Sequence, residues 1–402
     1  MSEAAVAGIR ARVVARSPLA TTSPRHSFSG EVLHGTETYN TLVPESRRLA
    51  DLQDSATLFQ TPELVTAWAR HFATRRAVQL STIVVRDGAR PVLIWPLAIE
   101  RHLLISIARG AGAPIGQYDD ILIDPAADGR VALATALDVL RQSVHPDLLQ
   151  LERVRADSLL RTALPDMAPL NVPETAPYVD LSSGFAAALA RRPRYAAKQH
   201  RKRVKRLTKA GDCSIAVAMD PAEAEAWMLE ALSLKRAWLR DNGLLSRAFV
   251  RAETGNCLAE LARALCDPDA SPRMVIAKLR LDGRTAAIEV GFLHRKNFHL
   301  YLRAFAPDLS CFGPGNVLTE RMLEWCAANG IERYDMLPPR SRNKSEWQTG
   351  EVGVANYVLP MTWRGSLYAA GVPTLLGPML RDRFYALPAR LRSAVAGMTL
   401  RM

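Results

Sequence analysis

The 402-residue sequence lacks any run of 18 or more apolar residues, the length that a membrane-spanning helix needs. Its most apolar stretch near the C-terminus, Ser366–Leu380, is interrupted by Pro373 and Pro378. The N-terminus alternates Ala and Val with Arg and has no compact apolar core before a cleavage site, so it does not read as a secretory signal. These absences predict a soluble protein of the cytoplasm.

Cysteine is sparse and scattered. All five cysteines lie in the second half of the chain, with no Cys-x-x-Cys pair and no Cys/His cluster at metal-ligand spacing. This pattern argues against a disulfide framework, favours a reducing compartment and leads us to expect no metal site. The five are Cys213, Cys257, Cys266, Cys311 and Cys326.

Acidic residues are missing from one long segment. The chain has 52 Lys and Arg against 40 Asp and Glu, a formal charge of +12, and ten of the basic residues lie between Arg191 and Lys209. Read as a helix from Tyr195, these cations cover most of the circumference, which fits a solvated helix or one that faces a polyanion. Tyr195 is the only aromatic residue there, so a base-stacking platform is not supported.

A charged helix between domains is the simplest interpretation of this basic segment. Nucleic acid, an anionic polysaccharide, a membrane surface and the phosphates of CoA are all electrostatically compatible partners. The sequence does not favour nucleic acid among them.

The length and composition predict a globular chain of two domains. Hydrophobic residues make up 48% and charged residues 23% of the chain, close to the globular average. Strand and helix patterns recur in a similar order in both halves, which indicates an α/β chain with a duplicated domain. The predicted parts are a flexible lead-in (1–40), a first domain (41–185), a basic segment (186–210), a second domain (211–362) and a helical tail (363–402).

Local signals place the main elements. Thr61-Pro62-Glu63 has the N-cap, first-turn Pro and first-turn acid of a helix start. Leu80–Val85 and Pro91–Ile99, joined at Asp87-Gly88, predict a hairpin. The second domain is predicted to contain strands at Met274–Leu281, Thr285–Leu293, Phe298–Phe305 and Ile331–Leu337, and a helix at Asn316–Ala328.

A glycine-containing loop lies between the third of these strands and that helix. Helix N-termini present unpaired N–H groups and a partial positive charge, so such a loop can bind an anion such as a pyrophosphate. An ordinary strand-to-helix turn is the alternative, because a Gly-x-Gly before a helix is common. The candidate anion-binding residues are Phe312, Gly313, Gly315, Asn316 and Val317.

The C-terminal stretch resembles the GNAT-type acyltransferase domain of the CelD-like polysaccharide-biosynthesis proteins. Pro314-Gly315, Gly330 at a helix end and Asp335-Met336-Leu337 at a strand end match the family pattern, as do Lys344 and Trp347 in their spacing. Two positions depart from that pattern: Pro339 stands where the family usually has Gly, and Asn343 where it usually has Tyr, a residue able to donate a proton.

The resemblance continues toward the N-terminus, in the same order along the chain. Phe59–Glu63 through Trp68 is similar to the opening helix of the family, and Trp95-Pro96-Leu97 to one of its strands. Tyr118-Asp119-Asp120 looks like its Tyr/Asp-rich loop, and residues 201–206 like its Arg-rich lead into the second domain. The resemblance thus covers about residues 41–360.

The resemblance implies two tandem GNAT-like domains, each a mixed twisted sheet flanked by helices. It implies transfer of an acyl group from acetyl-CoA or another acyl-CoA to an amine or hydroxyl of a small-molecule or saccharide acceptor, in polysaccharide or envelope metabolism. The nucleophile must lose a proton, so a carboxylate base is expected. Asp335 and Glu289 are the candidates, with Lys344 as a charge that reaches a phosphate or carboxylate and Tyr301 as a proton donor.

Each candidate has a structural alternative. Glu289 lies in an apolar strand, so it is partnered, faces a cleft or points to solvent; Asp335 either serves the site or caps local backbone. Lys344 is otherwise a surface lysine, and Tyr301 a packing residue. Acceptor binding is assigned to Tyr118, Asp119, Asp120 and Trp347, although adjacent acids are often simply solvated and Trp347 suits packing better.

Two other functions stay open. A tRNA-dependent aminoacyltransferase of the Fem type has the same tandem architecture, and its basic helix would contact RNA. A non-catalytic CoA-binding or regulatory module would retain the fold without turnover. The tail alternates apolar runs with arginines, so it either packs on the domain or associates peripherally with a membrane surface. These arginines include Arg381, Arg383, Arg390 and Arg392.

Overall fold

The structure is a computed structural model that describes residues 28–399 except 75–76, 103, 165–167, 250 and 372–376. The regular chain begins earlier than the sequence suggests. Strand β1 (Ser29–His34) pairs antiparallel with β2 (Val78–Asp87), and helix α1 (Thr36–Thr41) follows it. The flexible lead-in predicted for 1–40 is therefore wrong for residues 29–40, because β1 gains a ladder partner more than forty residues away that its short polar sequence does not reveal.

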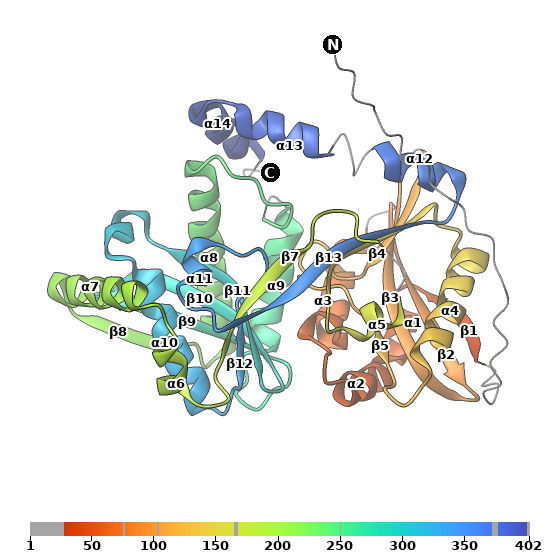
Figure 1. Ribbon diagram of the computed structural model, residues 1–402, viewed down its shortest axis with the longest axis horizontal. Coiled ribbons are helices and arrows are strands. Elements are labelled where there is room, and N and C mark those ends of the chain that lie inside the picture. Colours follow the sequence, from red (N-terminus) through yellow and green to blue (C-terminus); the bar gives the residue numbers. More distant parts are fainter. Residues whose placement is uncertain are drawn as a thin grey trace, which may run out of the picture.

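One mixed sheet runs through the whole molecule, with helices on both faces (Figure 1). Its strand order is β1-β2-β3-β4-β6-β13-β7-β12-β11-β10-β9-β8, with β5 paired to β3. The first half contributes β1, β2, β3 (Arg90–Arg101), β4 (Ser106–Gly110), β5 (Leu122–Ile123) and β6 (Leu148–Arg155), with α1, α2 (Val43–Leu52), α3 (Pro62–Phe72), α4 (Gly129–Val139) and α5 (Leu159–Ala163).

The second half begins with the basic segment and ends with the tail helices. Its strands are β8 (Cys213–Val217), β9 (Arg273–Leu281), β10 (Arg284–His294), β11 (Asn297–Phe305) and β12 (Arg333–Asp335). Its helices are α6 (Phe185–Ala190), α7 (Arg194–Ala210), α8 (Pro221–Asp241), α9 (Ala252–Ala264), α10 (Pro314–Ala328) and α11 (Arg342–Ser345), followed by α12 (Trp363–Gly371), α13 (Gly377–Ala386) and α14 (Ala389–Thr399).

Several local predictions are confirmed. Thr61 is the N-cap of α3 and Pro62 its first residue. The hairpin β2–β3 turns at Gly88, whose φ of 59° is one that glycine adopts without strain. The basic segment forms α7, and the tail is helical.

The two halves have the same element order, and each borrows a strand from the other. In each half a run of antiparallel strands ends in a parallel pair joined by a helix: β4 with β6 through α4, and β11 with β12 through α10. The next strand of the first half, β7 (Glu174–Asp180), then pairs with β12 of the second half. The last strand, β13 (Gly350–Pro360), pairs with β6 of the first half and, through residues 350–354, with β7.

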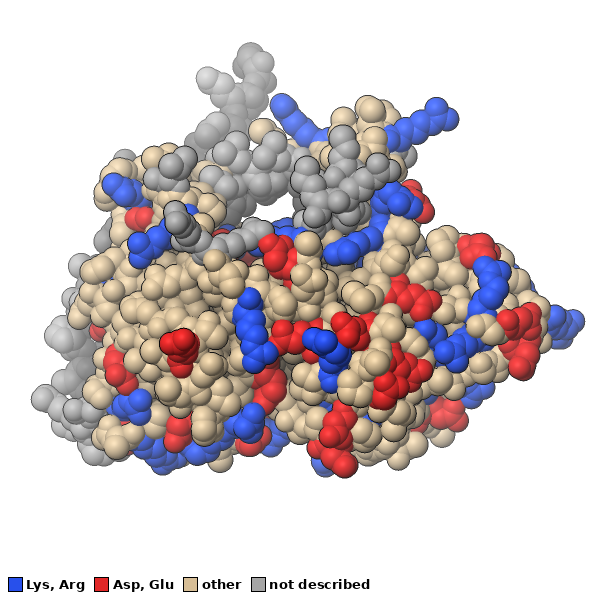
Figure 2. Space-filling view, turned by 180° about the vertical axis from the view of Figure 1, so that it is seen from behind, with Lys and Arg blue, Asp and Glu red and all other residues tan. Residues whose placement is uncertain are grey.

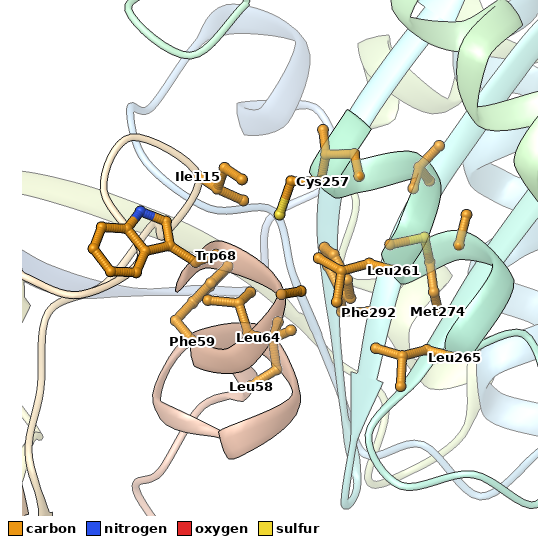
Figure 3. Packing of buried hydrophobic residues seen from close by; sticks show 14 of the residues in the cluster. Leu58, Phe59, Leu64, Trp68, Ile115, Cys257, Leu261, Leu265, Met274 and Phe292 are labelled. Atoms are coloured by element: carbon orange, nitrogen blue, oxygen red, sulfur yellow. The ribbon is translucent and has the colours of Figure 1, made fainter. Parts of the chain in front are cut away.

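A hydrophobic core joins the halves on one face of the sheet (Figure 3). Phe59 and Leu64 from the α3 region face Leu261 of α9 and Phe292 of β10 across the boundary, and Trp68 belongs to the same core. The rings of Phe59 and Phe292 meet edge to face at 6.5 Å. Burial of each such side chain stabilises the fold by about 1.5–3 kcal/mol, so the two halves form one packed unit.

Candidate functional site

A cleft of about 830 Å³ lies between the two halves. On the second-half side it is lined by β11, by the end of α8 with the loop that follows, and by the loop after β12. The first-half side is lined by Arg109, Ala113, Pro114, Gly116, Gln117, Asp119, Glu152 and Arg153. A concave site with polar groups contributed by both halves is the usual place for a ligand.

The cleft exists because β11 and β12 separate. They pair in parallel only through residues 297–299 and 333–335, after which β11 continues to Phe305 paired with β10 on its other edge. The chain after β12 turns away, with the N–H of Met336 donating to Pro177 O. Residues 300–305 all line the cleft, and within the described chain no strand pairs with this edge of β11 beyond His299. Alternate N–H and C=O groups of a strand point to each edge, so β11 presents unpaired backbone groups to the cleft.

The equivalent gap in the first half is closed. β4 and β6 pair through residues 107–109 and 148–150, and the chain at Asp119 then fills the space beyond. The N–H of Asp119 donates to Glu152 O at 3.1 Å, and the N–H of Glu152 donates to Asp119 Oδ2 at 2.6 Å. An open strand edge is therefore a feature of the second half.

Six basic side chains line the cleft. Two of them, Arg109 and Arg247, donate to Oε1 of Glu152 at 2.9 and 3.0 Å. Among the described residues no ion pair involves the other four. These four, which we name the cationic group, are Arg153, Lys235, Arg303 and Lys344. Cations that line a cleft without forming an ion pair favour an anionic ligand.

Burial perturbs both lysines of the cationic group. Burial, together with the charge of Arg303, lowers the pKa of Lys235 to about 8 and that of Lys344 to about 8. Lys344 Nζ donates to Leu337 O at 2.7 Å and to Pro339 O at 2.9 Å. An ammonium has three N–H groups, so one remains for a ligand.

Arg153 reaches the cleft through an unusual backbone conformation. Its φ is 54°, in the left-handed region that costs energy for a residue with a Cβ. The conformation is held because its N–H donates to Asn356 Oδ1 at 2.7 Å. The side chain then donates to Gln117 Oε1 at 2.6 Å, which fixes it at the cleft wall.

The predicted anion-binding loop lies at the N-terminus of α10. Gly313 has a φ of 64° and lets the chain turn into the helix. The N–H groups of Asn316 and Val317 donate to Gly313 O at 3.1 and 3.4 Å, whereas the N–H of Gly315 has no acceptor among the described residues. Phe312 is half-buried against the core of the second half.

Two arginines flank this loop. A Cβ added to Gly313 would lie 3.0 Å from Arg203 Cδ, and one added to Gly315 would lie 3.3 Å from Arg303 Cδ. The loop itself does not line the cleft, but Arg303 lines the cleft and touches the loop. Arg203 Nη1 donates to Glu346 Oε2 at 2.8 Å, whereas Arg303 forms no ion pair among the described residues. A helix N-terminus beside such a guanidinium favours a phosphate.

Residues 194–347 match the family model described as an acetyltransferase (GNAT) domain. This segment contains β11, the α10 loop and three members of the cationic group. These residues are therefore similar to a GNAT domain. No curated protein matches the chain.

Three solved structures resemble the chain over most of its length. FemX has 11% sequence identity and a TM-score of 0.56, with 82% of this chain and 98% of that chain covered. The C-terminal domain of a putative lysylphosphatidylglycerol synthetase from Agrobacterium fabrum has 12% and 0.51, with 82% and 95% covered. A conserved protein of unknown function from Bacteroides thetaiotaomicron VPI-5482 has 11% and 0.50, with 79% and 96% covered. These likenesses concern the fold, and the α/β class with two GNAT-like halves is confirmed.

Asp335 lies at the junction of the halves, not on the cleft wall. Its carboxylate accepts from Tyr118 Oη at 3.0 Å, from Arg155 Nη1 at 3.1 Å and from the N–H of Leu337 at 2.7 Å. The side chain is 2% exposed and its oxygens are engaged. Asp335 therefore caps local backbone and forms a buried ion pair, which is the structural alternative, and it does not line the cleft as the expected base would.

Glu289 is also buried away from the cleft. It is fully buried, accepts from Thr319 Oγ1 at 2.8 Å and from Tyr334 Oη, and burial raises its pKa. The solvent-facing alternative is therefore wrong. The carboxyl is partnered, as burial in an apolar strand requires, and it does not itself line the cleft.

Of the three predicted acceptor-binding residues in the first half, one lines the cleft. Asp119 does so, and burial raises its pKa to about 7. Tyr118 is buried and donates to Asp335 instead. Asp120 is buried and accepts from the N–H groups of Ile121 and Leu160 at 2.9 and 3.1 Å. Tyr118 and Asp120 thus make hydrogen bonds inside the fold and do not line the cleft, so the prediction that they bind the acceptor is corrected.

The remaining candidates divide in the same way. Tyr301 lines the cleft, and its hydroxyl has no hydrogen-bond partner within the described chain. Trp347 lies outside the cleft, beneath the guanidinium of Arg192 at 3.5 Å, which confirms packing over substrate contact. Within the described ranges no His, Cys, Asp and Glu side chains gather into a group of three or more that could hold a metal, and no helix is long and apolar enough to cross a membrane.

Sequence reasoning missed most of the cationic group. Arg303 could have been found by the pattern that led to Glu289, because each is a lone charged residue in an apolar strand. Lys235 and Arg153 carry no such signal, because a lysine on a long helix and an arginine in a half-polar strand are commonly solvated. Their convergence depends on contacts between the halves that the sequence does not show.

Proposed function

We propose that the protein transfers an acyl group from a CoA thioester to an amine or hydroxyl of an acceptor bound in the cleft. One observation carries this proposal: within a GNAT domain, the unpaired edge of β11 opens into a cationic cleft beside the N-terminus of α10. The resemblance to CelD-like proteins supports a small-molecule or saccharide acceptor of polysaccharide or envelope metabolism.

In this proposal the acyl-CoA donor lies along β11. The pantetheine arm of CoA carries two amides, which can pair with the free backbone groups of residues 300–305 as an added strand does. The pyrophosphate then lies at the α10 N-terminus, where the N–H of Gly315 has no acceptor among the described residues and Arg303 supplies charge. This order places the thioester in the cleft.

The chemistry uses groups that face the cleft. The acceptor nitrogen or oxygen bonds to the thioester carbon, the C–S bond breaks, and the acceptor proton leaves to a base while CoA departs as its thiolate. The free N–H of Lys344 stabilises the negative charge that develops on the carbonyl oxygen. Asp119, with its pKa raised to about 7, is the carboxylate positioned to take the proton, directly or through water.

Calorimetric titration of acetyl-CoA and longer acyl-CoAs into the full chain tests the donor. Gly315→Asp puts a negative charge where the pyrophosphate binds, so it should abolish binding. Gly371→Asp, a matched change in open space on α12, should not affect it. Loss of binding in both variants, or no binding by well-folded wild type, would refute the donor assignment.

Single-turnover kinetics on a panel of amine and sugar acceptors tests the reaction. Lys344→Met should retain acyl-CoA binding and lower the transfer rate by about a hundredfold, because it removes one donor to the oxyanion. An unchanged rate would remove Lys344 from the reaction.

A further inference from the structure

Exposed apolar side chains are concentrated in the C-terminal helices. Fifteen large hydrophobic residues are exposed in the described chain, and six of them lie beyond residue 362, in about a tenth of the sequence. Exposed apolar residues that gather in one place mark a contact surface, whereas scattered ones need no explanation. We name these six the C-terminal apolar face: Trp363, Leu367, Met379, Tyr385, Leu387 and Leu391.

The orientation of α12 is fixed by its opposite side. A Cβ on Gly365 would lie 1.8 Å from Asp147 O, so only glycine allows this close approach. Thr362 Oγ1 donates to Asp147 Oδ1 at 2.6 Å and anchors the start of the helix. Trp363 and Leu367 are one turn apart and point away from Gly365, at 71% and 65% exposure. The body of the protein leaves this stripe outward-facing.

The same segment is strongly basic. Residues 363–402 contain six arginines and one acid, Asp382. Arg364, Arg383 and Arg390 are exposed, and no ion pair of theirs is found among the described residues. Lys and Arg side chains project from this end of the molecule in Figure 2. Trp, Leu and Arg on exposed helices are the composition of a segment that lies in a membrane interface.

The apolar face flanks the mouth of the cleft. Tyr368 of α12 lies near enough to the cleft-lining Arg247 to contribute to its raised pKa. Arg392 of α14 packs against Gly243, just before the cleft-lining residue Leu245. Figure 1 shows the three helices along one long side of the molecule, with α13 and α14 above α8 and α12 above β4.

We propose that the C-terminal apolar face docks on the surface of an anionic phospholipid bilayer and holds the mouth of the cleft at that surface. The positive charge of the C-terminal segment favours an anionic lipid surface over a second copy of the chain. A second copy of the chain would bring six arginines and one acid against the same set, and like charges across an interface oppose association. An anionic lipid surface instead attracts each cation by about 1 kcal/mol and accepts the apolar side chains.

Vesicle co-sedimentation of the full chain tests the proposal independently of acyl transfer. The protein should bind vesicles of equal parts phosphatidylcholine and phosphatidylglycerol, bind phosphatidylcholine alone more weakly, and lose affinity for the anionic vesicles as salt rises. The double variant Trp363→Ser/Leu367→Ser should lower that affinity at least about tenfold, since each side chain contributes on the order of 1 kcal/mol or more on burial.

The controls separate the face from general hydrophobicity. Leu104→Ser/Val172→Ser removes two exposed apolar side chains elsewhere, at 84% and 85% exposure, and should leave vesicle binding unchanged. Arg364→Ala/Arg383→Ala/Arg390→Ala should weaken binding to the anionic vesicles and flatten its salt dependence. Circular dichroism and acyl-CoA titration verify the fold of each variant.

Three results would overturn the proposal. One is the absence of vesicle binding by the folded wild type. Another is equal loss of binding in the Leu104/Val172 control and the Trp363/Leu367 variant. The third is a concentration-dependent dimer, seen by light scattering, that the Trp363/Leu367 variant abolishes while no vesicle binding occurs, because that assigns the face to a second copy.

Discussion

The buried contact of Asp335 with Arg155 and Tyr118 gives the sharpest test of how the halves are joined. In Asp335→Asn the carboxylate charge that faces Arg155 Nη1 at 3.1 Å is lost. Arg155 keeps its two bonds to Asp157, at 2.8 Å each, so it is not left wholly unpaired. Removing one partner of a buried pair costs roughly 3–5 kcal/mol, and we expect the lower end, about 3 kcal/mol.

Tyr118→Phe tests the same buried contact with a smaller change. It removes one hydroxyl that donates to both oxygens of Asp335 at 3.0 Å but leaves the other two donors in place. A hydrogen bond to a charged group contributes about 1.5–3 kcal/mol, so the free energy of unfolding should fall by about 1.5 kcal/mol. Urea unfolding followed by intrinsic fluorescence measures both changes.

A double-mutant cycle of Asp335→Asn with Arg155→Met identifies the pair. Residues in direct contact show a coupling energy of about 0.5–3 kcal/mol, and acyl-CoA affinity should be unchanged in the folded variants. The reasoning is refuted if Asp335→Asn leaves the unfolding free energy unchanged while it slows acyl transfer, because Asp335 would then serve the reaction and not the junction.

Three further predictions concern burial and pH. Lys235→Met should raise the free energy of unfolding at pH 7 and weaken binding of acyl-CoA or acceptor, because burial lowers the pKa of Lys235 to about 8 and makes the charged form costly. In the wild type the free energy of unfolding should rise as pH increases from about 8 to about 10 and Lys235 loses its proton in the folded state. The variant should lack this rise. Gly365→Ala should release α12 and increase its proteolysis, whereas Gly371→Ala, in open space on the same helix, should not; equal cleavage of both would contradict the close approach to Asp147. Burial raises the pKa of Asp120 to about 7, so the wild type should lose unfolding free energy as pH rises from about 4 to 7, and Asp120→Asn should make that decline shallower in urea titrations at each pH.

Local features of the fold follow from the sequence. The start of α3 at Thr61-Pro62 and the β2–β3 turn at Gly88 depend on residues within a few positions of each other, so propensity and turn chemistry reveal them. The pairing of β7 with β12 and of β13 with β6 depends on partners far along the chain. An alternating strand pattern does not name its partner, and β1 escaped detection for the same reason.

The site shows the same division. The glycine loop and Lys344 are recognisable from spacing and resemblance, and the structure places both at the cleft or beside it. Asp335 and Glu289 have the residue type of a base, but their function depends on what they touch. Arg155 is 180 positions from Asp335, and Tyr334 is 45 from Glu289, so sequence patterns do not show that these carboxyls are engaged.

The exchange of β7 and β13 has a consequence for how the chain is made. As the polypeptide leaves the ribosome, the first half emerges with the edge of β6 unpaired, because the strand that covers it ends at Pro360. Nearly the whole chain must be synthesised before either half is finished. An exposed strand edge is prone to wrong pairing in this interval. A nascent chain halted before residue 350 should therefore hold an aggregation-prone first half that depends on chaperones until β13 is synthesised and pairs with β6.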